Sequence, residues 1–433
     1  MSDSARAGQI IDVFQDAFGV LAAADPGAFH RKFRKMANTP FAFYRGSACL
    51  FDYDIVGEPD PFVNERTGRV WVHGDLHAEN FGTYMNSKGV LVFNVNDFDE
   101  AYVGPFTWDV KRFSASLALI GYAKAISDEA ISELVRTYAN AYITELRAIA
   151  TGGDDAIGEL TLDTTHGVLH DVLQQARLNT RVDMLNKQTS VENYDRKFAM
   201  QDGVFTVDED TRERVTDAFR DYITTLPESN TFSVDSLHVK DIVLRKGVGI
   251  GSAGLPSYNV LLEGPTQALE NDIIIYLKQG QTPAAARHIT DERITNYFHH
   301  QGHRTTESQR ALQAHADHWG GFTTLDGVGL MAAEVSPYAA DLDWDEVNEP
   351  EELLEVVAEL GRATARMHSV ADDDSSHDLV DFSTETEIVR AIEKDEAGFV
   401  DMLVDFAHSY GARARADHQI FVDLNRNNEL KLH

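Results

Sequence analysis

The spacing of apolar residues divides the chain into three regions. Residues 1–235 show mainly helical spacing, residues 236–340 carry short apolar runs bounded by glycines and acidic turns, and residues 341–433 return to helical spacing. This order predicts an α+β protein in which an antiparallel sheet lies between two helical regions.

Short apolar runs place the individual strands. In the first region VWVHG and VLVFNVND predict strands, and a helical pattern runs from Trp108 to about Arg147. In the second region the predicted strands are HVKDIVLRK, YNVLLEG, DIIIYLKQ and GVGLMAAEVSP, with helices from about Pro283 to Asp317. The third region predicts long helices through EELLEVVAELGRATARMHS and IVRAIEKDEAGFVDMLVDFAHSY.

Charge narrows the classes of function. The 433 residues include 70 Asp and Glu against 38 Lys and Arg, a formal net charge of -32. Such an excess argues against nucleic acid as a partner, because polyanions are repelled. Acids spread along the whole chain favour a halophilic, salt-rich cytosol, and an acidic protein in ordinary salt is the alternative.

Hydropathy and cysteine content indicate where the protein is expected to lie in the cell and which cysteine chemistry it can have. No window reaches the roughly 18 apolar residues of a membrane helix, and the N-terminus lacks a basic and then hydrophobic leader, so we expect a cytoplasmic protein that does not cross a membrane. Cys49 is the one cysteine, which excludes an internal disulfide and a cysteine-based zinc site. Its apolar neighbours predict a packed, inert thiol.

The first group of candidate residues follows two predicted strands. In VWVHGDLHAENFG a strand leads to a turn with His73 and Asp75, and Asn80 follows Asp75 by five positions. The strand VLVFNVND then ends in Asp97 and Asp99. Two carboxylates and an amide carbonyl at neighbouring strand ends suit magnesium and the base of a phosphoryl transfer. The alternative for any one of these residues is that its side chain only forms hydrogen bonds with backbone groups of a turn.

The second group surrounds the glycine-rich sequence GVGIGSAG, in which Gly249, Gly251, Ser252 and Gly254 are candidate phosphate-binding residues. A predicted strand stands on each side, whereas a dinucleotide-binding fold needs a helix after the glycines. Strand, glycines and strand are typical of the kinase loop that covers nucleotide phosphates. Lys278 on the next strand would pair with the phosphates, or lie in water at the strand end.

Three further charged residues complete the candidates. Glu307, on a predicted helix, is a candidate acidic partner for Lys278. Arg45, with Arg34 upstream, offers guanidinium donors to an anionic substrate or the transferring phosphate, and a structural ion pair is the alternative.

Two motifs resemble known phosphotransferases. HGDLHAEN and NDFDEA look like the catalytic and metal-binding loops of aminoglycoside phosphotransferase and choline kinase relatives. The resemblance implies that Asp75 is the catalytic base, that Asn80 and Asp97 bind magnesium, and that His73 stabilises the loop. WDVKRFSASLAL is similar to the helix whose leading acid, here Asp109, braces that loop.

The order of the motifs is reversed relative to ordinary kinases, because the catalytic loop precedes the glycine-rich hairpin and the helix ELGRATARMHS lies near the C-terminus. This order, with FAFYRG, GPFTWDVKR and the Lys278 strand, resembles a bacterial and archaeal family called domain of unknown function 2252. The resemblance implies a circularly permuted, two-lobed protein-kinase-like fold with an antiparallel-sheet nucleotide lobe and a larger helical lobe, using ATP and Mg²⁺.

The expected function is ATP-dependent transfer of a phosphoryl group to a hydroxyl acceptor. The short interval between NDFDEA and WDVKR leaves no room for a segment that docks a protein substrate, so a small molecule is favoured. One alternative is a non-catalytic, kinase-like module that binds nucleotide and regulates a partner. Another is a metallophosphoesterase whose ligands would be His73, Asp75 and His77, with His315 and His318 as further histidines.

Overall fold

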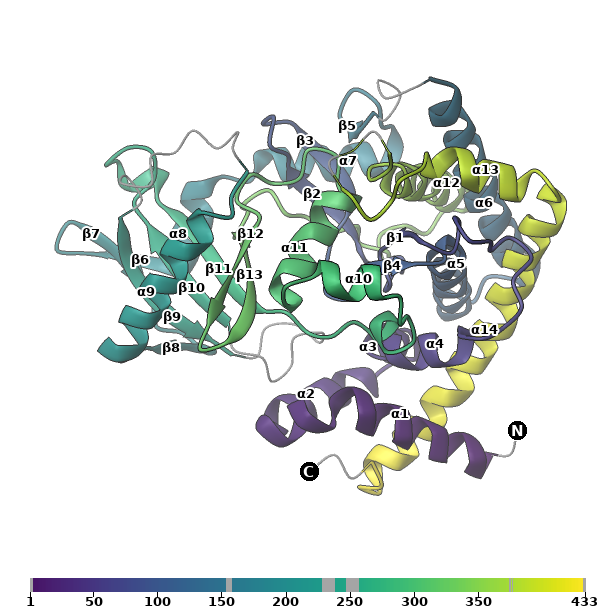
Figure 1. The fold of residues 1–433 in the computed structure, drawn as a ribbon, viewed down its shortest axis with the longest axis horizontal. Coiled ribbons are helices and arrows are strands. Elements are labelled where there is room, and N and C mark those ends of the chain that lie inside the picture. The colour runs from purple at the N-terminus through teal and green to yellow at the C-terminus, as the bar shows by residue number, and fades with distance from the viewer. Residues whose placement is uncertain are drawn as a thin grey trace.

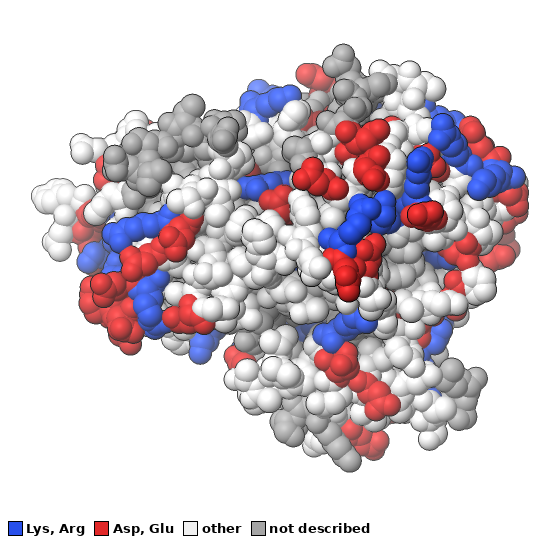
Figure 2. Space-filling view, in the orientation of Figure 1, with Lys and Arg blue, Asp and Glu red and all other residues white. Residues whose placement is uncertain are grey.

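A computed structural model of the chain describes residues 3–152, 158–227, 238–246, 257–373, 375 and 377–430. The fold is mixed α and β, with antiparallel sheets (Figure 1). One side of the molecule is built on a six-stranded sheet, and the other, larger side is mainly helical. On the face shown in Figure 2, acidic side chains lie in small groups over both sides, many of them beside basic ones.

The six-stranded sheet has the order β12-β13-β11-β10-β9-β8, and every neighbouring pair is antiparallel. Along its strands, apolar residues either alternate with polar ones or form continuous runs. Helix α9 covers one face of the sheet, where Val215, Phe219 and Tyr222 share a core with Val260 and Ile275. The elements of this side are α8 (Arg181–Gln188), β6 (Thr189–Glu192), β7 (Asp195–Phe198), β8 (Val204–Thr206), α9 (Glu209–Ile223), β9 (Val239–Arg245), β10 (Ser257–Leu262), β11 (Ile273–Gln279), α10 (Glu292–Tyr297), α11 (Gln301–Leu312), β12 (Gly321–Leu325) and β13 (Val328–Glu334).

The helical side is organised around α5, which is buried along almost its whole length. Helices α6 and α12 pack closely together beside it, and α14 runs along its other flank. The elements are α1 (Asp3–Ala24), α2 (Pro26–Met36), α3 (Pro40–Gly46), α4 (Ala48–Ile55), β1 (Val70–Val72), β2 (Phe81–Met85), β3 (Leu91–Val95), β4 (Tyr102–Gly104), α5 (Phe106–Ala123), α6 (Asp128–Gly152), β5 (Leu160–Thr161), α7 (Gly167–Leu178), α12 (Pro350–His368), α13 (Thr384–Ile392) and α14 (Glu396–Arg426).

The two ends of the chain are fastened to each other. Arg6 on α1 donates to Asp54 on α4 at 2.7 Å and to Asp417 on α14 at 2.6 Å, and all three side chains are buried. A buried guanidinium shared by two carboxylates is strongly directional, so it fixes α1 against α14. Both termini consequently lie at one end of the molecule (Figure 1).

The boundary expected at residue 235 is wrong. Residues 181–227 pack with the sheet: β8 pairs with β9, and the apolar face of α9 lies against β12. The β8 strand is three residues long and exposes Phe205, so its alternation of apolar and polar positions is too short to be recognised in the sequence. The predicted strands and helices around it are present, including β9, β10, β11 and β13.

Candidate active site

The loop at residues 73–80 is held by Asp109, the first acidic residue of α5. One carboxylate oxygen accepts the backbone N–H of His73 at 2.6 Å and the other accepts that of Gly74 at 2.9 Å. Gly74 has a φ of +76°, and a Cβ there would lie 2.2 Å from the carbonyl oxygen of Glu100, so only glycine fits. The Nε2 atom of His368 lies 3.1 Å from Asp109, which places the end of α12 beside this loop, as the motif order predicts.

His73 joins the two loops that carry the candidate acids. Its Nε2 atom lies 2.7 Å from the carbonyl oxygen of Asn96, just before Asp97. The backbone N–H of Asn96 in turn donates to the carbonyl of Asn80 at 3.1 Å. These bonds hold the 73–80 loop and the end of β3 in one fixed arrangement.

Asp75 lies against a buried arginine, Arg112, whose contact with Asp75 no motif in the sequence indicates. Arg112, on α5, donates from Nε to Oδ1 of Asp75 at 2.7 Å and also from Nη2 to the same oxygen. The guanidinium also lies 4.3 Å from the ring centroid of Tyr44. Oδ2 of Asp75 lies 3.9 Å from Nε2 of His77, whose burial lowers its pKa well below the usual value and so keeps it neutral. One oxygen of Asp75 is thus fixed by Arg112, whereas no hydrogen bond from the described residues reaches the other.

Asn80 and Asp97 lie beside Asp75. The side-chain amide of Asn80 donates to the carbonyl oxygen of Asp75 at 2.9 Å, so its own carbonyl oxygen stays available as a ligand. Asp97 has a φ of +57°, a conformation that costs energy in a residue with a side chain and that is found at functional sites. Asp97 is exposed to the cavities, and desolvation by the protein packed around it and, after that, the Asp99 carboxylate raise its pKa.

Lys278 pairs with Asp99. The expected pairing with Glu307 is wrong. The ammonium group of Lys278, on β11, forms an ion pair with Oδ2 of Asp99. Glu307 on α11 instead binds Arg310 at 2.7 Å, one turn further along its own helix. Spacing alone could not show this, because an (i, i+3) partner on the same helix competes with any more distant one.

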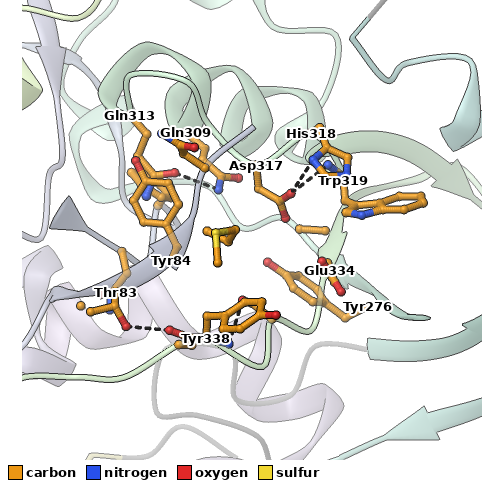
Figure 3. A pocket seen from close by; sticks show the side chains of 18 of the residues that line it. Thr83, Tyr84, Tyr276, Gln309, Gln313, Asp317, His318, Trp319, Glu334 and Tyr338 are labelled. Atoms are coloured by element: carbon orange, nitrogen blue, oxygen red, sulfur yellow. Dashed lines mark hydrogen bonds and ion pairs between the residues drawn. The ribbon is translucent and has the colours of Figure 1, made fainter. Parts of the chain in front are cut away.

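A cavity of about 460 Å³ opens between the sheet and the helical side. This main cavity is reached by Asp97, Asp99 and Lys278 and is lined further in by Tyr84, Tyr276 and Tyr338. Figure 3 shows Gln309, Gln313 and Asp317 on one side of it and Tyr276 and Tyr338 on the opposite side. The wall combines aromatic rings with many polar and charged side chains, so the cavity suits a polar organic ligand that also has an aromatic part.

Two acids, Asp317 and Glu334, also line the main cavity. Burial raises the pKa of Asp317 to about 6 and that of Glu334 to about 6, although Arg181 pairs with Glu334 and opposes the shift. Neither acid was recognised in the sequence. Each lies at the edge of a predicted element without any motif around it.

A second, smaller cavity of about 50 Å³ lies on the other side of Asp97 and Asp99. This small cavity is lined by Asp75, Glu100 and Arg45 in addition to those two acids. Arg45 forms an ion pair with Glu79 and still faces the cavity. Arg34 is exposed on α2 and lines neither cavity.

The glycine-rich residues Gly249, Gly251, Ser252 and Gly254 lie outside the described residues. The strands on either side are described, and they pair antiparallel from Ser257 opposite Arg245. The glycine-rich sequence therefore connects two adjacent strands of a hairpin, and it does not lead into a helix.

Other candidates take structural positions. Cys49 is buried, and burial raises its pKa to about 12, so the thiol is inert as predicted. In the described ranges, no three His, Cys, Asp or Glu side chains form a group that could hold a metal ion. Likewise, no helix of the described chain is long and apolar enough to cross a membrane.

A comparison with family models matches residues 24–424 to an uncharacterised protein family conserved in bacteria, DUF2252. The chain belongs to this family. The DUF2252 match spans both sides of the molecule and includes every candidate residue discussed above. Searches of curated proteins and of solved structures found no match.

Proposed function

We propose that the protein is an ATP-dependent phosphotransferase with a circularly permuted, kinase-like architecture, acting on a small hydroxyl-bearing acceptor. One observation carries the proposal: Asp75 and Asn80 of one loop lie close to Asp97, at the end of β3, and to Lys278 of β11, where the two cavities share Asp97 and Asp99 as lining residues. A base, two oxygen ligands and a lysine at one junction are the groups that phosphoryl transfer needs.

The path of the chain supports the permuted order. From β9 the sheet continues through β11 and α11 to β13, then residues 335–341 pass along the main cavity to α12. The end of α12 meets the 73–80 loop through His368 and Asp109. Followed in space from β9 through α12 and then from β1 to α5, the elements take the order of an ordinary kinase.

The donor set fits magnesium. Asn80 and Asp97 would hold the ion, and it would neutralise the phosphate charge that develops during transfer. Magnesium commonly takes one or two carboxylates from the protein and its remaining ligands from phosphates and water, so a larger acidic cluster is not required. Lys278 would exchange its ion pair with Asp99 for one with a nucleotide phosphate.

The acceptor would enter from the small cavity. Oδ2 of Asp75 is then the atom that accepts the hydroxyl proton, and Arg112 holds the carboxylate in position. The main cavity, with its aromatic walls, would take the nucleotide base.

Lys278→Ala tests the proposal through nucleotide binding. We expect the affinity for ATP with magnesium to fall roughly tenfold or more, since a charge-assisted hydrogen bond is lost. Lys197→Ala, at an exposed position of strand β7, is the matched control and should bind as the wild type does. Calorimetry on both variants measures the effect.

Three outcomes of that experiment separate the candidate functions. Unchanged affinity in Lys278→Ala refutes the site. Nucleotide binding without phosphoryl transfer to any of a panel of small alcohols, or slow transfer to water, would favour the regulatory module. No nucleotide binding by the wild type would remove both.

A further inference from the structure

The small cavity contains a buried lysine that the site described above does not use. Lys32, on α2, lines this cavity together with Asp75, Arg45 and Arg287. Its side chain is 5% exposed. Lys32 faces the same cavity as the 73–80 loop, although it lies more than forty residues before that loop in the chain. Arg45 and Asp75, each from another element, face this cavity too.

Apart from Asp97, the other charged groups of the small cavity have protein partners. Arg112 binds Asp75, Lys278 binds Asp99, and Glu100 accepts the backbone N–H of Ala284 at 2.6 Å. The two arginines of the cavity wall are also paired, Arg45 with Glu79 and Arg287 with Asp16.

Lys32 differs from all of them. Among the described residues, no carboxylate lies within ion-pair distance of its ammonium group, which instead lies 4.2 Å from the ring centroid of Phe18 and 5.8 Å from that of Phe29. Burial lowers its pKa. A second donor is also unsatisfied, because the buried Nε of Arg45 has no hydrogen-bond acceptor.

Aromatic contact alone does not explain a lysine in this position. A cation over a ring gains about 0.5–2 kcal/mol, whereas burying an unpaired ammonium group costs several kcal/mol. A core position would be filled better by leucine or methionine. The carboxylates of Glu100, Asp75 and Asp99 attract its charge from a distance, but none of the described carboxylates binds the ammonium group, so its hydrogen-bond donors remain open to an anion from outside the chain.

We propose that the small cavity binds an anionic group, a phosphate or carboxylate, of the acceptor, with Lys32 as its principal cation and the Nε of Arg45 as a further donor. The anion site itself does not depend on the proposed function. Only the assignment of the bound anionic group to the phosphoryl acceptor rests on that function. The acceptor is then a small alcohol that already carries a negative charge, with its hydroxyl directed at Asp75 and its anionic group at Lys32. A cationic acceptor would place its charge beside the unpaired ammonium group.

Inorganic phosphate is the probe, and Lys32→Met is the variant, because methionine fills the space between Phe18 and Phe29 without the charge. We expect phosphate to bind the wild type and to bind Lys32→Met at least roughly tenfold more weakly, since a charge-assisted contact is lost. Lys35→Met, exposed on the same helix, should bind phosphate as the wild type does. Thermal unfolding verifies that each variant is folded.

A second arm distinguishes the acceptor from the nucleotide as the source of the anion. If the cavity serves the acceptor, Lys32→Met keeps its affinity for ATP with magnesium, and saturating nucleotide does not displace phosphate. If that affinity falls with Lys32→Met, or nucleotide competes with phosphate, the assignment to the acceptor is overturned. Equal phosphate binding by wild type and Lys32→Met, or none by either, overturns the anion site itself. Because phosphate binding is measured without nucleotide, its result is independent of whether the protein proves to be a kinase.

Discussion

At the scale of single residues, Asp75 and Asp97 occupy different positions and so have different expected roles. Asp75 lies on the small cavity with one oxygen fixed by Arg112, whereas Asp97 lines both cavities beside Asn80. A base acts mainly in the transition state, and a metal ligand acts as soon as the nucleotide binds.

Asp75→Asn should therefore lower phosphoryl transfer at least about 100-fold and preserve nucleotide binding, because proton transfer by a positioned base contributes that much. Asp97→Asn should instead weaken the magnesium dependence of ATP binding. Calorimetry with and without magnesium separates the two roles. Asp60→Asn is a matched control, since it removes the partner of another α5 cation, Lys111, outside both cavities. If Asp75→Asn loses the magnesium response and Asp97→Asn keeps it, the roles are exchanged.

Glu100 gives the site a dependence on pH. Burial raises the pKa of Glu100 to about 7, above its value of about 4.3 in an unfolded chain. The folded state thus holds this proton more tightly, so the stabilisation is complete below pH 4 and is lost as the pH rises through 7. Glu100→Gln removes the titration and keeps an acceptor for the N–H of Ala284.

Measured by urea unfolding without nucleotide, the stability of Glu100→Gln relative to the wild type should increase by roughly 2–3 kcal/mol between pH 5 and pH 8. If the stabilities of Glu100→Gln and the wild type change in parallel between pH 5 and pH 8, the pKa of Glu100 is not raised. Ala284 belongs to the short segment that closes the small cavity, so the same comparison reports on that wall.

At the scale of elements, α11 is tied to the loop after β3 through one buried side chain. Arg304 is 1% exposed and donates to the carbonyl oxygens of Phe98, Asp99 and Ala101 and of Gln281, at 2.8 to 3.0 Å. Burial lowers its pKa to about 10. The loop that follows Asp97 and the segment after β11 are thereby held to one helix.

Arg304→Met should destabilise the fold by about 3 kcal/mol or more, because four buried carbonyls lose their donor. The unfolding midpoint in urea measures this, and Arg220→Met on the exposed face of α9 should change it little. A loss in Arg304→Met no larger than in Arg220→Met would show that water replaces the guanidinium and that the loop does not depend on α11.

The same scale shows what the sequence could predict. Strands β9, β10 and β11 and helix α12 have strong periodicity within themselves, and the loops at Asp75 and Asp97 carry recognisable motifs. Arg112 and Arg304 are ordinary helix positions in the sequence, since their partners are distant along the chain and meet them only in the folded protein. Lys32 is harder still, because its distinguishing property is the lack of a partner.

At the scale of the whole molecule, the excess of acids is larger than the ion pairs can balance. The net charge is -32, and the basic side chains on the face in Figure 2 lie mostly beside acidic ones, so the remaining carboxylates repel one another. Repulsion between exposed charges weakens as the Debye length shortens from about 10 Å at 0.1 M salt to about 3 Å at 1 M. Hence the folded state should gain stability from salt, as a protein suited to a salt-rich cytosol would.

Raising sodium chloride from 0.1 to 1 M at pH 7.5 should increase the melting temperature by at least about 3 °C, a few kcal/mol for a chain of this length. The same titration near the sequence pI of about 4.8 is the control, because the net charge there is close to zero and little repulsion is left to screen. Equal increases at both pH values would show that salt acts by strengthening apolar burial, and the halophilic interpretation of the composition would then fail. A large increase at pH 7.5 alone would tie the stability of the fold to its charge.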